Sequence, residues 1–307
     1  MMRTPRDRIP YSPIVNRPPL VLPGGARLIV WVIVNVENWD PERPMPRAVL
    51  PPPMGGNPLI PDLPNWAWHE YGMRVGFWRV LEALHQRAIV PTLACNGSVC
   101  SAYPEMVAAG LKVGWEFMGH GYVQTSMHNI KDQRDSIRRT LNAIADSTGK
   151  PPRGWESPGL TETFETIDLL AEEGIEYVAD WVLDDQPCYV STSVGSIVSL
   201  PYTVEMNDVA MMAVAQRPSE EFLTRGKRQF DRLYAEKRQN HPRYVDQRPP
   251  LSHRRRPPDR LFRGATRLYC GPRGRTVLDR GADSRLVPRS AARRDNIGPS
   301  LTQGRFR

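Results

Sequence analysis

The chain has 307 residues, of which 40% are hydrophobic and 24% charged, with 31 prolines and 23 glycines. This composition is typical of one or two globular domains and excludes a collagenous or wholly disordered protein. The formal net charge of +8 is unevenly distributed, because residues 1–236 carry 22 basic and 28 acidic side chains, whereas residues 237–307 carry 19 basic and 5 acidic ones. The basic character therefore belongs to the C-terminal segment, and the rest of the chain is mildly acidic.

Neither a secretory signal nor a membrane span is expected. The first residues are charged and proline-rich, and the longest apolar run, Leu28–Val36, has nine residues, whereas a membrane helix needs about 20. The four cysteines (Cys95, Cys100, Cys188 and Cys270) fit no zinc-finger or CxxC spacing, so we expect buried thiols. These features predict a cytoplasmic protein.

The first predicted element is a strand over residues 28–36, a continuous β-branched run typical of a strand buried on both faces. Residues 41–64 contain nine prolines and predict a long loop of the kind that shapes active sites. Strands and helices then alternate: we expect helices over residues 71–87, 103–109, 130–148, 161–173 and 218–236, and strands over 88–95, 112–118, 175–180 and 195–202. This alternation predicts an α/β fold with a mainly parallel sheet or barrel.

Past residue 237 the periodicity stops, and no window supports an amphipathic helix or a paired strand. We therefore expect a disordered Arg/Pro-rich tail. Such a tail could bind nucleic acid, but it offers no stacking platform or folded reader, so we expect neither a nucleic-acid nor a membrane partner.

Polar side chains cluster where predicted strands end. Glu37 and Asn38 follow the first strand, His120 follows a later one, and residues 180–185 bring several aspartates. In parallel α/β sheets and barrels these ends share one face, where a carboxylate and an imidazole can perform acid–base chemistry on an amide or ester. Taken singly, a glutamate at a strand end is more often solvated, and a histidine between glycines is more often a turn residue.

Several segments, in order, resemble one branch of the polysaccharide deacetylase (NodB homology) superfamily, that of the cofactor-independent allantoinases and peptidoglycan-deacetylase-like enzymes. These segments are residues 66–79, WEFMGHGY (115–122), RGWESPGLTET (153–163), EEGIEYVADWVLDDQP (172–187) and SLPYTVEMND (199–208). The resemblance implies a distorted (β/α) barrel over residues 28–236, preceded by an arm over 1–27. It also implies hydrolysis of a non-peptide C–N bond in an N-acetylated sugar or a small cyclic ureide or imide.

The metal site of the family's zinc-dependent members is altered here. Those members use an aspartate and two histidines spaced HxxxH, whereas this chain has Glu37 for the aspartate and Gln124 at the second histidine position. His128 lies eight residues after His120, too far to share its helical turn. Because an amide is a poor zinc ligand, we expect no cofactor, with zinc as the alternative.

The resemblance also suggests a role for each candidate residue. Glu37 would activate or orient water, and His120 would hold the substrate carbonyl or donate a proton. The expected substrate-binding residues are Asn38, Arg153, Trp155, Asp184 and Asp185, with one of the two aspartates pairing with Arg153 or contacting the substrate. The expected partner is a small-molecule or sugar substrate, and a homo-oligomer is left open.

Family members continue beyond residue 236 with a strand carrying a His-Pro motif and two further helices. Here the Arg/Pro-rich tail replaces them, and reading its codons one base later could encode a string of the family's type from residue 249 onward. We interpret residues 237–307 as a frameshifted remnant, which would leave the barrel incomplete at its C-terminal end. A catalytically inactive barrel that retains a ligand pocket is the alternative function.

Overall fold

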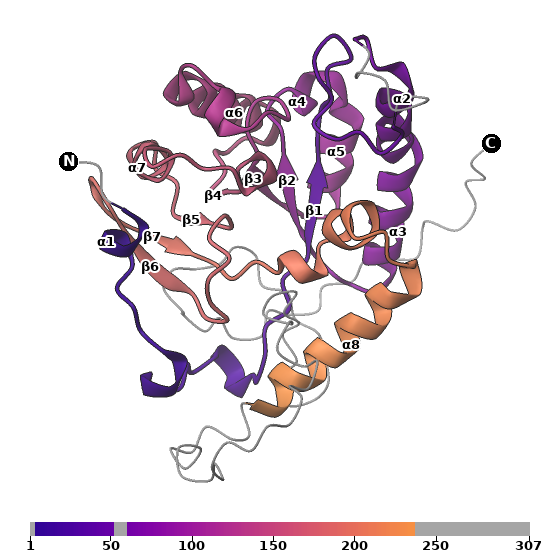
Figure 1. Ribbon diagram of the computed structural model, residues 1–307. Coiled ribbons are helices and arrows are strands. Elements are labelled where there is room, and N and C mark those ends of the chain that lie inside the picture. Colours follow the sequence, from indigo (N-terminus) through magenta and orange to yellow (C-terminus); the bar gives the residue numbers. More distant parts are fainter. Residues whose placement is uncertain (1–3, 52–59, 237–307) are drawn as a thin grey trace, which may run out of the picture.

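A computed structural model describes residues 4–51 and 60–236 of the protein (Figure 1). The resemblance to a (β/α) barrel is confirmed, since a curved, mainly parallel sheet is surrounded by helices. The tail lies outside the described residues, and so does part of the proline-rich loop. None of the described helices is long and apolar enough to cross a membrane.

Seven strands form one sheet in the order β1-β2-β3-β4-β5-β7-β6. All neighbouring pairs are parallel except β6 and β7, which form an antiparallel hairpin. The strands are β1 (Ile33–Val36), β2 (Thr92–Cys95), β3 (Glu116–Gly119), β4 (Gly154–Trp155), β5 (Tyr177–Val178), β6 (Cys188–Thr192) and β7 (Gly195–Ser199). Within the described residues β1 pairs with β2 alone, so the sheet is open along one side of β1.

Helices connect the parallel strands and cover the outside of the sheet (Figure 1). The α-helices are α1 (Pro5–Arg8), α2 (Leu63–Tyr71), α3 (Phe77–Gln86), α4 (Val99–Ala102), α5 (Pro104–Lys112), α6 (Gln133–Thr148), α7 (Thr166–Glu172) and α8 (Ser219–Glu236). The π-helices are η4 (Gly72–Gly76) and η8 (Val209–Val214). Short 3-10 turns complete the set: η1 (Ile14–Asn16), η2 (Pro23–Gly25), η5 (Met127–Asn129), η6 (Pro158–Leu160) and η7 (Val204–Met206).

The alternation of side chains along each strand separates an outer core from an inner one. Leu93 and Phe117 point outward and pack with α3 and α5 in one buried cluster. Their sequence neighbours Ala94 and Met118 belong to a different cluster, together with Tyr177 from β5. Because successive side chains in a strand face opposite sides, this second cluster fills the inside of the curved sheet.

Local capping explains the clearest helix. Asp132 accepts a hydrogen bond from the backbone nitrogen of Asp135 at the start of α6, and Gly149 ends the helix in the left-handed region at φ 78°. The helix predicted over residues 130–148 is therefore confirmed, but it begins at Gln133, after the N-cap Asp132.

Other predicted boundaries were wrong. The helix expected over residues 71–87 is instead α2 and α3 joined through η4, and the strand expected over 112–118 starts only at Glu116, because α5 continues to Lys112. The strands expected over 28–36 and 175–180 contain only four and two paired residues. Strands β4 and β6 were not predicted, and β4 has only two residues.

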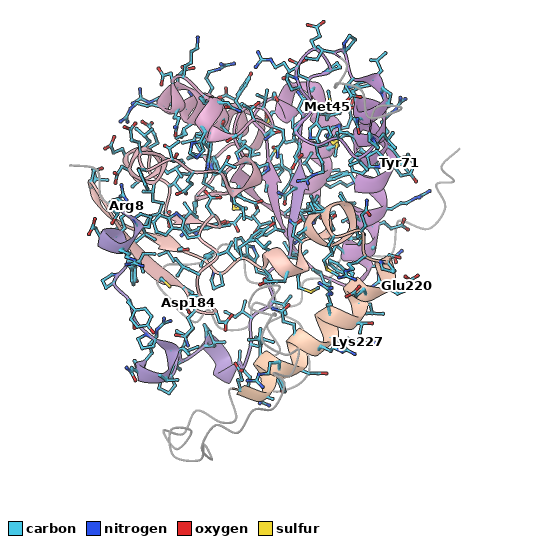
Figure 2. All side chains as sticks on the ribbon, viewed as in Figure 1. Arg8, Met45, Tyr71, Asp184, Glu220 and Lys227 are labelled. Atoms are coloured by element: carbon cyan, nitrogen blue, oxygen red, sulfur yellow. The ribbon has the colours of Figure 1, made fainter. Side chains whose placement is uncertain are left out.

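The N-terminal arm is fastened to the far end of the sheet. The guanidinium of Arg8 is only 2% exposed and forms a double hydrogen bond with Asp168 of α7, at 2.8 and 2.6 Å. It also donates to the carbonyl oxygens of Ser191 and Phe164, at 3.0 and 2.9 Å. The arm therefore packs as part of the domain, beside β6 (Figure 2).

Candidate active site

The carboxyl ends of the first five strands bring one polar residue each to the same end of the barrel. Glu37 follows β1, Asn96 follows β2, His120 follows β3, Glu156 follows β4 two residues after Gly154, and Asp180 lies just beyond β5. Since these strands are parallel and adjacent, their ends form one polar face. The structure thus brings together Glu37 and His120, as the sequence predicts.

Glu37 and His120 form the centre of this face. The Nε2 atom of His120 lies 3.6 Å from Oε1 of Glu37, and the indole of Trp39 donates to Oε2 of Glu37 at 2.7 Å. His120 is 1% exposed, whereas the Glu37 side chain is 23% exposed. Glu37 is therefore the member of the pair that a ligand can reach, and His120 lies behind it.

A second carboxyl group lies on the other side of the imidazole. Nδ1 of His120 donates to the backbone carbonyl of Glu156 at 2.7 Å, and Oε1 of the Glu156 side chain is 4.0 Å away. Asn35 of β1 donates to that same carboxyl oxygen at 2.8 Å. The other oxygen of Glu156 is buried and has no hydrogen-bond partner among the residues that the structure describes. The imidazole is thus enclosed between two acids from different strands.

This arrangement sets the charges of the three groups. Burial lowers the pKa of His120, but the adjacent carboxylate of Glu37 and the charge of Glu156 outweigh it and raise the pKa to about 9. Burial raises the pKa of Glu37, but the adjacent imidazolium of His120 and the hydrogen bond from Trp39 reverse this, so the net pKa is lowered. Burial also raises the pKa of Glu156, to about 7. Near neutral pH the centre therefore holds an imidazolium beside an ionised Glu37.

The main chain of Glu37 is held by a buried aromatic pair. Nε2 of His69 donates to the carbonyl oxygen of Glu37 at 2.9 Å, and the ring of Trp39 stacks on His69 at 4.7 Å between centroids. Burial lowers the pKa of His69, which keeps this ring neutral. His69 therefore positions the strand end that carries the carboxylate.

Asn96 links three of the loops at this face. Its side-chain oxygen accepts from the backbone nitrogen of Asn38 at 2.8 Å, and its amide donates to the carbonyl oxygen of His120 and to Gln124. The Asn38 amide in turn donates to Ser98 at 3.1 Å. Asn38 is therefore at the site as predicted, with its side chain engaged by the loop after β2.

Residues 69–178 match the family model described as polysaccharide deacetylase. In this stretch the chain is similar to the polysaccharide deacetylases. It is 26% identical to Helicobacter pylori peptidoglycan deacetylase over 137 residues, and 26% identical over 188 residues to a polysaccharide deacetylase-like protein of Schizosaccharomyces pombe. These alignments cover 44% and 54% of this chain and 46% and 58% of the relatives, so the chain spans about half the length of the curated relatives it matches.

Solved structures of two proteins have a similar fold. A crystal structure of Puue allantoinase superposes with a TM-score of 0.67 at 26% identity, covering 77% of this chain and 81% of the other. A probable polysaccharide deacetylase of Pseudomonas aeruginosa PAO1 superposes with a TM-score of 0.64 at 28% identity, covering 73% and 78%. Both names fall in the branch that the sequence motifs resemble.

The donor set at this end of the barrel does not fit a zinc ion. Gln124, at the second histidine position, contacts the Asn96 amide, and His120 directs its two nitrogens at Glu37 and at the Glu156 carbonyl. Among the described residues no group of three or more His, Cys, Asp or Glu side chains could hold a metal ion.

Two expected pocket residues lie elsewhere. Arg153 precedes β4, at the opposite end of the sheet from Glu37, and its guanidinium pairs with Glu176 at the start of β5. Trp155 is fully buried in the outer core, where its indole donates to Ser157 at 3.0 Å. Arg153 lies before the two residues of β4 and therefore at the other end of the strand, and Trp155 lies within β4 with its side chain in the buried core.

The expected pairing of an aspartate with Arg153 is also wrong. Asp184 instead pairs with Arg17 of the N-terminal arm at 2.6 Å and accepts from the backbone nitrogen of Gln186 at 2.9 Å. Asp185 adds its charge to the surroundings of the same arginine. Figure 2 shows Asp184 on the side where the arm passes. Both aspartates therefore interact electrostatically with Arg17 of the N-terminal arm.

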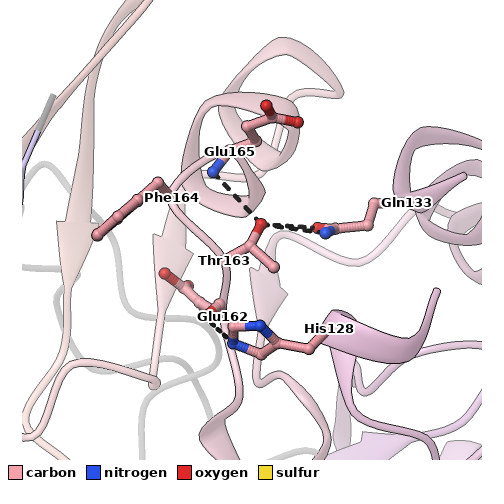
Figure 3. Close-up of a pocket in the computed structure, with 6 residues that line it drawn as sticks. All are labelled: His128, Gln133, Glu162, Thr163, Phe164 and Glu165. Carbon is pink, nitrogen blue, oxygen red and sulfur yellow. Dashed lines mark hydrogen bonds between the residues drawn. The ribbon is translucent and has the colours of Figure 1, made fainter. Parts of the chain in front are cut away.

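Two neighbouring cavities open beside this end of the barrel. One, of about 360 Å³, is lined by residues that include His128, Glu162 and Phe164 (Figure 3). The other, of about 320 Å³, shares Glu162 and adds Asp180, Trp181 and several apolar side chains. His128 donates to the carbonyl oxygen of Glu162 at 3.0 Å, so this histidine belongs to a cavity wall.

Sequence reasoning missed Glu156, Asn96 and His69. Asn96 directly follows the strand predicted over residues 88–95, whose end is where β2 ends, so the rule that selected Glu37 and His120 could have found it. Glu156 follows β4, which was not predicted. His69 carries no such signal, since its role depends on how α2 packs across the end of β1.

Proposed function

We propose that this chain hydrolyses a non-peptide C–N bond, in an N-acetylated amino sugar or a small cyclic ureide or imide. The observation that carries the proposal is the Glu37–His120 pair at 3.6 Å, in which the acid is partly exposed and the imidazole is buried behind it. The membership of residues 69–178 in the polysaccharide deacetylase family supports the same reaction class.

The pair supports a mechanism in which Glu37 acts first as a general base and then as a general acid. The Glu37 carboxylate takes a proton from a water molecule as that water attacks the substrate carbonyl, which forms a tetrahedral oxyanion. Glu37 then passes the proton to the leaving nitrogen as the C–N bond breaks, which restores the carboxylate. The acid and the amine are released as products.

The His120 imidazolium has an electrostatic part in this sequence. Glu37 and Glu156 stabilise the positive charge of His120. Because this charge is buried, it can stabilise the negative charge that develops on the oxyanion. Asn38 and Asn96 hold the loops that carry the two reacting groups. Charge stabilisation of this kind is preorganised, because the groups are already positioned before substrate binds.

A second candidate function is a catalytically inactive barrel that binds a ligand in its pocket. Gln124 at the second histidine position favours it, since that position loses a metal ligand. The frameshift interpretation of residues 237–307 favours it too, because those residues would then lack the His-Pro motif.

An activity panel distinguishes these functions. Acetylated chito-oligomers, allantoin and cyclic imides would be incubated with the present chain and with a chain re-encoded in the alternative frame after residue 236, each with and without chelator. Turnover that Glu37→Gln abolishes and Glu42→Gln leaves intact supports hydrolysis, because Glu42 is an exposed glutamate of the adjacent loop. Ligand binding without turnover in both chains supports the inactive barrel.

A further inference from the structure

An exposed tryptophan lies beside the candidate active site and has no part in the proposed chemistry. Trp68 belongs to α2, and its side chain is 44% exposed. Its ring lies 6.2 Å from the ring of Trp39, with an angle of 43° between the two planes. Trp39 is the residue whose indole donates to Oε2 of Glu37 at 2.7 Å. Two indoles therefore connect the proposed general base to the surface of the protein.

The helix that carries Trp68 is fastened on both sides of this residue. Asn65 is buried, and its side chain forms hydrogen bonds of 2.8 to 2.9 Å with the backbone of residues 49–50. His69 donates to the carbonyl oxygen of Glu37 at 2.9 Å. Asn65 and His69 are four residues apart, so they share a face of the helix, whereas Trp68 is turned about 100° from His69. The anchored helix therefore holds Trp68 in place beside the polar face.

The chemistry of an indole determines what such a residue can bind. An indole ring presents a large apolar surface, and its π face carries a partial negative charge. One face of a pyranose ring consists of C–H groups, which are apolar and weakly positive, so this face can stack on an indole. A sugar ring is therefore a suitable ligand for the exposed face of Trp68.

The exposure of Trp68 also distinguishes the two substrate classes. Sites for small molecules enclose most of the ligand surface, which a cyclic ureide or imide would require. Trp68 offers one open wall, and this suits one ring of a longer chain whose other rings remain in solvent.

We propose that Trp68 is a stacking platform for a sugar ring of the substrate, and that this substrate is an oligosaccharide of N-acetylated amino sugars. This inference rests on the proposed hydrolase function and selects the sugar over the ureide or imide. Because Trp39 lies between Trp68 and Glu37, the ring on Trp68 is a neighbour of the ring whose acetamido group reaches the carboxylate. Stacking on Trp68 then helps to position that acetamido group for attack.

The experiment measures binding of the N-acetylglucosamine trimer by isothermal titration calorimetry. The full chain carries Glu37→Gln, which removes the proposed general base, so that the trimer is not consumed during the titration. Trp68→Ala should weaken binding by about 10-fold or more, as expected for the loss of a tryptophan that carries much of the contact. Trp68→Phe keeps an aromatic face and should restore most of the affinity.

Trp78→Ala is the matched control. Trp78 is 39% exposed and lies in α3, where its ring packs edge-on against Phe77 at 5.3 Å between centroids. This variant removes an exposed indole of similar accessibility and should change the affinity by less than about twofold. Circular dichroism reports whether each variant stays folded.

The outcomes separate this inference from the hydrolase proposal on which it rests. Unchanged affinity in a folded Trp68→Ala chain, equal losses in Trp68→Ala and Trp78→Ala, or no binding of the trimer would overturn the platform. Turnover of allantoin or a cyclic imide by the parent chain, without trimer binding, would support hydrolysis and overturn the platform. Trimer binding that depends on Trp68, in a parent chain that hydrolyses none of the panel, would support the platform and contradict the hydrolase function.

Discussion

Replacing Glu37 by glutamine tests the charge coupling at the centre of the proposed site. The substitution keeps the size of the side chain and removes its negative charge. The pKa of His120 should then fall, because the favourable charge of Glu37 is lost while the burial that opposes the imidazolium remains.

The size of this fall follows from the geometry. Two unit charges 3.6 Å apart interact by about 4.6 kcal/mol at an effective dielectric constant of about 20. One pKa unit corresponds to about 1.4 kcal/mol, so the pKa of His120 should drop by about 3 units. The imidazole would then be largely neutral at neutral pH, whereas in the parent chain it is charged.

The assay is a pH titration of the His120 ring nitrogens by NMR, with the resonance assigned by its disappearance in His120→Gln. Glu42→Gln is the control and should leave the His120 titration unchanged, since Glu42 is exposed. Turnover of the best substrate from the panel should fall by about 10²- to 10⁴-fold in Glu37→Gln, the usual value of a general base.

A His120 titration midpoint that stays within about half a pKa unit of the parent value in a folded Glu37→Gln chain would contradict the charge coupling between Glu37 and His120. Retained turnover with a shifted midpoint would instead remove Glu37 from the chemistry while leaving the electrostatics intact. Circular dichroism of the variant separates either outcome from a loss of folding.

Two further predictions concern stability. The pKa of Glu156 is raised to about 7 in the folded chain, so its contribution to stability is full below its unfolded pKa and is lost as the pH rises through 7. The unfolding free energy measured in urea should therefore fall between about pH 5 and pH 8, and Glu156→Gln should reduce this fall by about 3 kcal/mol. An unchanged fall would contradict the burial of this acid. Arg8→Ala removes a buried guanidinium that bonds Asp168 and two backbone carbonyls, and should lower the unfolding free energy by about 3 kcal/mol. Arg6→Ala, at an exposed position of the same helix, should change it by less than about 0.5 kcal/mol. Equal effects of the two arginine substitutions would show that the arm does not fasten the domain.

The sequence alone determined the fold class and the two central residues of the proposed site. Alternating apolar segments predict the α/β barrel, because helices and parallel strands bury their apolar faces with different periods. Glu37 and His120 follow segments of this kind, so the rule that parallel strands end on one face was enough to place them together.

Only the tertiary structure decided which other residues join them. A strand of two residues such as β4 has too little periodicity to locate, and this placed Arg153 at the wrong end of the barrel and hid Glu156. The pairing of Asp184 with Arg17 and the hydrogen bond from His69 to the Glu37 carbonyl depend on how segments far apart in the sequence pack together. Such contacts join side chains through three-dimensional packing, and the spacing of residues along the chain does not encode them.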